Sequence, residues 1–157
     1  MEDLKHYESR AARALVIMHE TQLRQVVDVW KKARAANVQL PETSDTDYES
    51  LETLLKHLLG AARNYMVWMC KQLDLADPEI KPPPSLQTIE KEADSYSEHL
   101  LERWRLPLAN VAPQSLEAKS YTSNWGDPFT IDGMLEHAVM HPMRHAFQLQ
   151  ELINKQS

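Results

Sequence analysis

The sequence has little glycine and almost no cysteine. Only three of its 157 residues are glycine, and Val and Ile are outnumbered by residues that favour helices. This composition argues against a sheet-rich fold. The single cysteine, Cys70, excludes a disulfide within the chain and is typical of proteins in a reducing compartment. We expect its thiol to be packed and inert.

The chain also lacks a long apolar run and a concentration of basic charge. Apolar runs such as Ala14–Met18 are far shorter than the ~20 residues that a membrane-spanning helix needs. The polar N-terminal segment Met1–Lys5 lacks the apolar core of a signal peptide. The formal net charge is -6, from 17 basic and 23 acidic residues, and no basic stripe is present to bind nucleic acid. We therefore expect a cytoplasmic protein with neither nucleic acid nor membrane as a partner.

What the sequence does contain is apolar residues at helical spacing in four long stretches. We expect helices over roughly residues 2–36, 46–73, 85–105 and 131–154. The second is predicted to open at Thr46–Glu49, which has the form of a capping box. Thr130 is the expected N-cap of the last helix.

The segments between these helices carry most of the prolines, and no strand pattern competes with the helices. Each amphipathic helix must bury its apolar stripe against the others, so we predict an all-α four-helix bundle in one domain over residues 1–157. The long connection before the last helix is a candidate for lining a pocket. Within it, Trp125 either forms a wall of that pocket or packs into the core.

Three histidines, His137, His141 and His145, follow one another at four-residue steps in the last predicted helix. Residues at this spacing lie about 40° apart around a helix, so the imidazoles form one row. A pair at that spacing can bind a single metal ion. His57 interrupts an aliphatic stretch of the second helix, where an unpaired buried imidazole would cost about 1–3 kcal/mol. We expect His57, His141 and His145 to be the ligands, an arrangement that leaves one coordination position open.

His137 is the rival to His145. It either binds the ion in its place or orients a bound water. The other histidines, His6, His19 and His99, have acidic or polar neighbours and are expected to face solvent.

Other metal chemistries fit the sequence less well. A di-iron carboxylate bundle needs Glu-x-x-His on two helices, and a zincin needs His-Glu-x-x-His. The chain contains no Glu-x-x-His. The residue after His141 is Pro142, where a zincin has its glutamate. A proline inside a helix removes a backbone donor and predicts a kink. The alternative is a last helix that begins after Pro142.

Three segments of the sequence carry a resemblance to a known family. These are His57 within Tyr48–Leu58, the aromatic-rich segment Tyr65–Trp68, and the late motif His141-x-x-x-His145-x-x-Gln148. On these residues the chain resembles the DinB/YfiT-like superfamily of metal-binding four-helix bundles. The resemblance implies that His57, His141 and His145 bind a divalent ion, usually nickel, zinc or iron. Gln148 and His137 are then expected beside the ligands. The chain departs from the family at Pro142, where relatives tend to have an acidic residue.

The resemblance also implies a range of functions. Some members resemble thiol transferases that use bacillithiol, mycothiol or glutathione, so the main expectation is a metal-dependent transferase that joins a low-molecular-weight thiol to a small-molecule substrate. A metal-dependent hydrolase and a non-catalytic metal-binding stress-response bundle, a homodimer through a helix face, are the alternatives. A metal-free interaction bundle with an accidental histidine row is a further one. Three imidazoles do not fix the identity of the metal.

Overall fold

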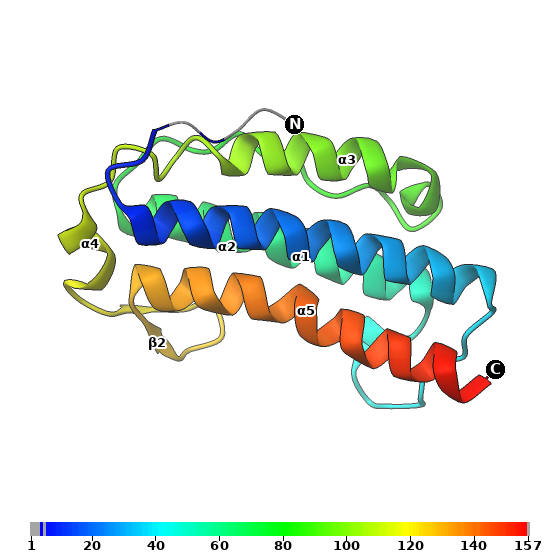
Figure 1. Ribbon diagram of the computed structural model, residues 1–157. Coiled ribbons are helices and arrows are strands. Elements are labelled where there is room, and N and C mark those ends of the chain that lie inside the picture. Colours follow the sequence, from blue (N-terminus) through cyan, green and yellow to red (C-terminus); the bar gives the residue numbers. More distant parts are fainter. Residues whose placement is uncertain (1–3, 5, 157) are drawn as a thin grey trace.

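The chain is predominantly helical in the computed structural model, which describes residue 4 and residues 6–156. The long helices are α1 (Arg10–Ala35), α2 (Leu51–Gln72), α3 (Ile89–Trp104) and α5 (Ile131–Gln156). They lie roughly along a common direction, with α1 between α3 and α5 in the view of Figure 1. The predicted all-α class is confirmed.

The connections contain small elements that the sequence did not predict. A 3-10 turn, η1 (Thr46–Tyr48), precedes α2, and a short helix, α4 (Pro113–Glu117), precedes the last connection. Strands β1 (Tyr121–Thr122) and β2 (Pro128–Phe129) pair antiparallel, with Tyr121 opposite Phe129. The expectation of no strand was therefore wrong for this short hairpin, whose turn carries Trp125.

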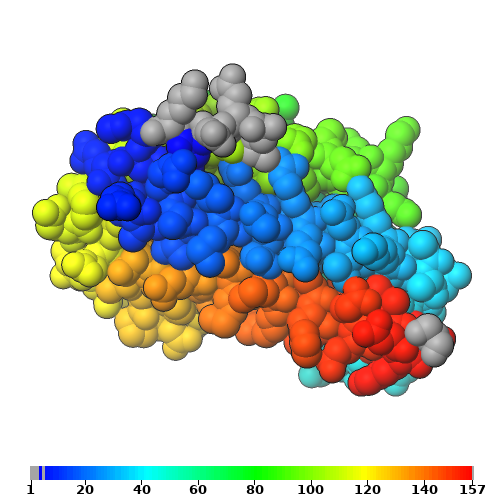
Figure 2. All heavy atoms as spheres, in the orientation of Figure 1, coloured from blue at the N-terminus to red at the C-terminus, as the bar shows by residue number. Residues whose placement is uncertain are grey.

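The core lies between the long helices, and α1 packs most extensively against α5. Figure 2 shows these two helices side by side across one face. Buried indoles fix the helices to one another, because Trp30 on α1 donates to the carbonyl of Leu51 at 2.6 Å and Trp104 on α3 donates to that of Ala62 at 2.9 Å. These bonds satisfy the polar atom of each large buried ring, as a packed core requires.

The first helix begins later than predicted. Its N-cap is Ser9, whose side chain accepts a hydrogen bond from the Ala12 amide at 3.1 Å, and the helix starts at Arg10. The predicted start, Glu2, lies outside the described residues. A serine hydroxyl satisfies one of the free amides of a helix end, which explains why the helix begins here.

The second helix also begins later than predicted, at Leu51 instead of Thr46. Ser50 is the cap, and its hydroxyl accepts from the Thr53 amide at 3.0 Å. The side chain of Asp45 accepts from the Asp47 amide, which closes the separate turn η1. The predicted capping box was wrong, because two successive caps divide this segment into a turn and a helix.

The last two helices are closer to the prediction. The third begins at Ile89 after a turn, four residues later than expected. For α5 the predicted N-cap Thr130 is confirmed, since its hydroxyl accepts from the Gly133 amide at 3.1 Å. Helix α5 continues without a break through Pro142, so the alternative of a later start is wrong. Among the described residues, no helix has both the length and the apolar character to span a membrane.

Candidate metal centre

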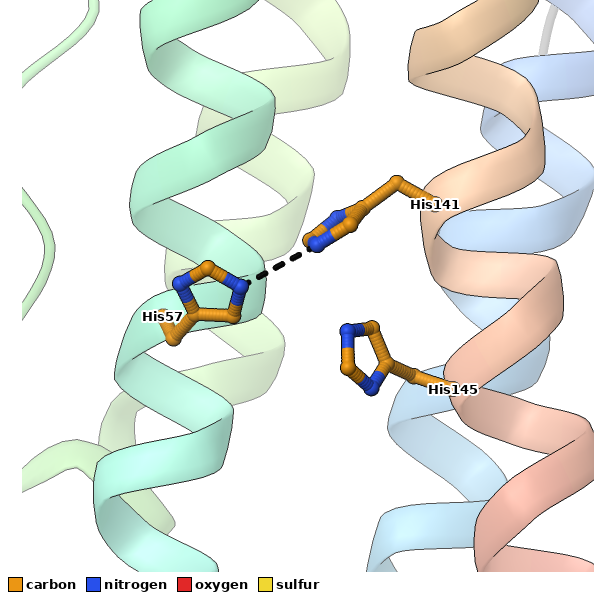
Figure 3. A group of neighbouring side chains, drawn as sticks. All are labelled: His57, His141 and His145. Carbon is orange, nitrogen blue, oxygen red and sulfur yellow. Dashed lines mark hydrogen bonds between the residues drawn. The ribbon is translucent and has the colours of Figure 1, made fainter. Parts of the chain in front are cut away.

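The three predicted ligands come together between α2 and α5. His57 lies on α2, while His141 and His145 lie one turn apart on α5. Figure 3 shows the three rings pointing into the space between the two helices. One ring nitrogen from each lies within 4.8 Å of those from the other two. Residues that are 84 and more positions apart in the chain thus share one site.

The distances between the rings suit a shared cation. Nε2 of His57 lies 3.1 Å from Nε2 of His141. Two nitrogens bound at 2.0–2.1 Å to a tetrahedral ion would lie about 3.3 Å apart. The ring of His145 lies with its centroid 4.7 Å from that of His141 and 5.8 Å from that of His57. The three nitrogens are therefore close enough together to hold one metal ion.

Burial keeps the two histidines of α5 in the form that binds metals. His141 is 6% exposed and His145 is 3% exposed. Burial, and then the positive charges of neighbouring histidines and Arg144, lower the pKa of His141 to about 3. The same kinds of cause lower the pKa of His145 to about 4. Both rings are therefore neutral at pH 7, and a neutral imidazole has a lone pair to offer a metal.

Two residues of the turn η1 contact the outward-facing nitrogens of two of the three rings. Asp47 Oδ2 lies 3.2 Å from Nδ1 of His57, and the hydroxyl of Tyr48 lies 3.4 Å from Nδ1 of His145. A carboxylate accepts only, so it favours the proton on Nδ1 of His57 and leaves Nε2 free to bind a metal. This role is not predictable from the sequence, where Asp47 and Tyr48 have the form of part of a helix cap.

His137 lies beside the three histidines without being one of them, since its ring stacks on that of His141 at a centroid distance of 6.4 Å. Its ring packs against Tyr65, Trp125 and Phe129, with centroid distances of 5.1–5.5 Å. It is not among the three histidines whose nitrogens converge. Gln148 also lies beside His145, where the two line one cavity and the Gln148 side chain opposes the lowering of the His145 pKa.

A cavity lies on each side of the three histidines. The first, which we call the aromatic cavity, has a volume of about 300 Å³ and is bounded by His57, Asn64, Tyr65, Trp68, Asn124 and Trp125. The second, the aliphatic cavity, has a volume of about 320 Å³, and its apolar walls are Leu40, Pro41, Leu54, Leu149 and Leu152. Trp125 is 47% exposed, so of its two predicted positions the structure shows the pocket wall.

The prediction for the remaining histidines was only partly right. His6 is exposed, but His99 is half-buried and accepts from the Lys81 amide at 3.0 Å. His19 is fully buried and stacks on Trp104 at a centroid distance of 3.7 Å, so the expectation that it faces solvent was wrong. Its acidic neighbour Glu20 is buried as well, where it accepts a hydrogen bond from Arg105 at 2.6 Å, so a polar neighbour in the sequence did not mark an exposed position. Burial lowers the pKa of His19 to about 3.

The single cysteine is buried, as predicted. Burial, with the nearby charge of Asp77, raises the pKa of the Cys70 thiol to about 11. The thiolate is the reactive form of cysteine, so the Cys70 side chain is unreactive at neutral pH.

Comparisons of the chain with models of protein families, with curated proteins and with solved structures found no match.

Proposed function

We propose that this protein is a DinB/YfiT-like four-helix bundle that binds a divalent metal ion through His57, His141 and His145. The observation that carries the proposal is the convergence of three ring nitrogens from two helices within 4.8 Å. Nickel, zinc and iron all accept imidazole ligands, and the donor set does not choose among them. Metal sites of this kind are built in bundle cores from side chains on facing helices.

The chemistry of the donor set fits such an ion. Both α5 histidines are buried and neutral, and two of the three rings have a partner at the nitrogen that faces away from the site. Such partners fix the orientation of each ring and the position of its proton. Such contacts are expected around metal ligands, and they are not expected around histidines that lie together by chance.

We further propose that the protein is a metal-dependent transferase that joins a low-molecular-weight thiol to a small electrophile. When bound, the ion would supply the acidity that converts the thiol of the co-substrate into a thiolate. The three histidines would fill three coordination positions of the ion and leave one open. The aromatic cavity, which His57 bounds, gives a small molecule access from another side. Cys70 is buried and has a raised pKa, so the protein does not supply the thiol itself.

A homodimer through a helix face is part of the same proposal. Met140, Met143 and Phe147 lie at i, i+3 and i+7 on α5, and each is about half exposed or more. Apolar residues at this spacing share one side of a helix. A second copy of the chain would cover them.

The test begins with protein purified without a His tag. Elemental analysis should find one ion per chain, and conjugation of a thiol to chlorodinitrobenzene should depend on that ion. His57→Ala should lose the ion and the thiol-dependent turnover, while the exposed control His6→Ala should keep both. A bound ion without turnover would favour the non-catalytic stress-response bundle, and hydrolysis without a thiol would favour the hydrolase. Absence of any bound metal would reject the whole proposal.

A further inference from the structure

The aliphatic cavity differs in character from the aromatic cavity on the other side of the histidines. Its walls are formed by Leu40 and Pro41 from the connection after α1, by Leu54 from α2, and by Leu149 and Leu152 from α5. These side chains bear no hydrogen-bonding group. Surfaces of this kind favour hydrocarbon over water, at about 25 cal/mol per Å² of apolar area covered.

One part of the cavity wall is polar. It is lined by Thr43, Tyr48, His145 and Gln148, and the Tyr48 hydroxyl lies 3.4 Å from Nδ1 of His145. The hydroxyls of Thr43 and Tyr48 and the carboxamide of Gln148 are neutral hydrogen-bonding groups. Glu151 and Lys155, which are exposed, bring one charge of each sign to the lining. The lining therefore favours neither an anion nor a cation.

The size of the cavity restricts what can occupy it. A volume of about 320 Å³ lies at the lower end of the range for small-molecule sites. A cavity of this size accommodates the hydrocarbon chain of a small molecule.

We propose that the aliphatic cavity binds the hydrocarbon chain of a small molecule with an uncharged hydrogen-bonding head group, such as a hydroxyl or a carboxamide. The chain lies against the leucines, and the head group bonds with Tyr48 and Gln148. This site does not require an ion between the histidines. It goes beyond the proposed transferase activity and stands or falls separately from it.

The test uses straight-chain alcohols from 1-butanol to 1-octanol, titrated into metal-free and metal-loaded protein and followed by NMR shifts of the leucine and alanine methyl groups. Affinity should rise about fourfold for each added methylene until the chain fills the cavity, and should then level off. The methyl groups of Leu149 and Leu152 should shift, whereas Ala61 in the aromatic cavity should not.

Two variants locate the site. Leu152→Trp places a large ring in the cavity from a half-buried position and should weaken 1-octanol binding at least tenfold. The matched control Ala61→Trp fills the aromatic cavity instead and should leave that affinity unchanged. Tyr48→Phe should weaken all the alcohols equally and preserve the dependence on chain length, because it removes only the head-group contact.

Two results would overturn the proposal. One is an affinity that does not change with chain length, and the other is a folded Leu152→Trp protein that binds 1-octanol as the parent does. Thermal melting of each variant shows whether it is folded, and Leu40→Trp, also half-buried, repeats the test if Leu152→Trp is not. A parent protein that binds the alcohols but no metal would reject the proposed metal centre and leave this site standing.

Discussion

At the scale of single residues, the site depends on neighbours that hold the ligands in place. Asp47 lies 3.2 Å from the far nitrogen of His57. Loss of a carboxylate in this position typically lowers metal affinity 10–100-fold, because the ring is no longer held in one orientation and tautomer. We expect Asp47→Ala to show a loss of about this size in competition with a chromophoric chelator. The exposed neighbour Glu49 provides the control, and Glu49→Ala should bind the ion as the parent does.

His19 leads to a prediction about stability. It is fully buried, and neither of its ring nitrogens has a hydrogen-bond partner among the described residues. Leucine has nearly the same volume and no polar atom to bury. Removal of an unsatisfied buried polar group should raise the free energy of unfolding by about 1 kcal/mol at pH 7. Urea denaturation of His19→Leu measures this, with the exposed His6→Leu as a control that should change little.

The same residue makes the fold sensitive to acid. Its pKa falls from the ordinary 6.5 to about 3 in the folded chain, so between these values the unfolded chain binds a proton that the folded chain does not. Stability therefore decreases as the pH falls from 6.5 towards 3. At pH 5 this difference in pKa lowers the free energy of unfolding by roughly 2 kcal/mol. His19→Leu, which has no group to protonate, should not show this loss. Equal loss of stability in parent and variant between pH 7 and pH 5 would contradict this account.

The sequence predicted some residues of the site better than others. His141 and His145 follow from helical spacing alone, because they lie on one element. Asp47 and His19 did not, since a carboxylate in a turn and a polar residue in an amphipathic helix have ordinary local explanations. Their positions depend on which parts of the chain pack together, and the local pattern does not carry that information.

At the scale of elements, a bound metal ion should crosslink α2 to α5. Anything that binds only the folded state raises stability, by about 2.7 kcal/mol at a concentration 100 times its dissociation constant. We expect a saturating metal to raise the melting temperature and to slow amide hydrogen exchange in the middle turns of α2 and α5. His57→Ala should abolish both effects, since it removes the only ligand on α2. Equal protection of α3 would show that the ion acts through some other site.

The boundaries of the elements were predicted less well than their existence. The start of α2 was misplaced because Thr46 and Ser50 are both chemically suitable N-caps, and only Ser50 opens the long helix. The continuous course of α5 through Pro142 followed from its unbroken apolar pattern. The β1–β2 hairpin has two residues in each strand, too few to produce a recognisable alternation.

At the scale of the whole molecule, the exposed apolar side of α5 predicts self-association. Phe147 is 65% exposed, with Met140 and Met143 beside it on the same side of the helix. If a second copy covers this surface, a charge at its centre should disrupt it. We expect the parent to sediment as a dimer and Phe147→Glu as a monomer with an unchanged helical circular dichroism spectrum. A monomeric parent at micromolar concentration would reject the dimer.

The helical class was the most predictable property of the molecule. Few glycines and many helix-forming residues at 3.6-residue spacing suffice to exclude a sheet-rich fold. The pairing of helices was not predictable in this way. An amphipathic stripe shows that one face of a helix is buried, but it does not show which other helix covers that face. That His57 lies near His141 and His145 therefore became visible only in the packing of α2 against α5.

The tryptophans give this chain a built-in optical reporter. The rings of Trp30, Trp68 and Trp104 are buried, and their indole N–H groups donate to backbone carbonyls. Only Trp125 has its ring substantially in water, at the edge of the aromatic cavity. Its fluorescence should therefore form the red side of the emission band and be the part that acrylamide quenches. A molecule entering that cavity would displace water from this indole and shift the band to the blue, so unlabelled compounds can be screened by light emission alone.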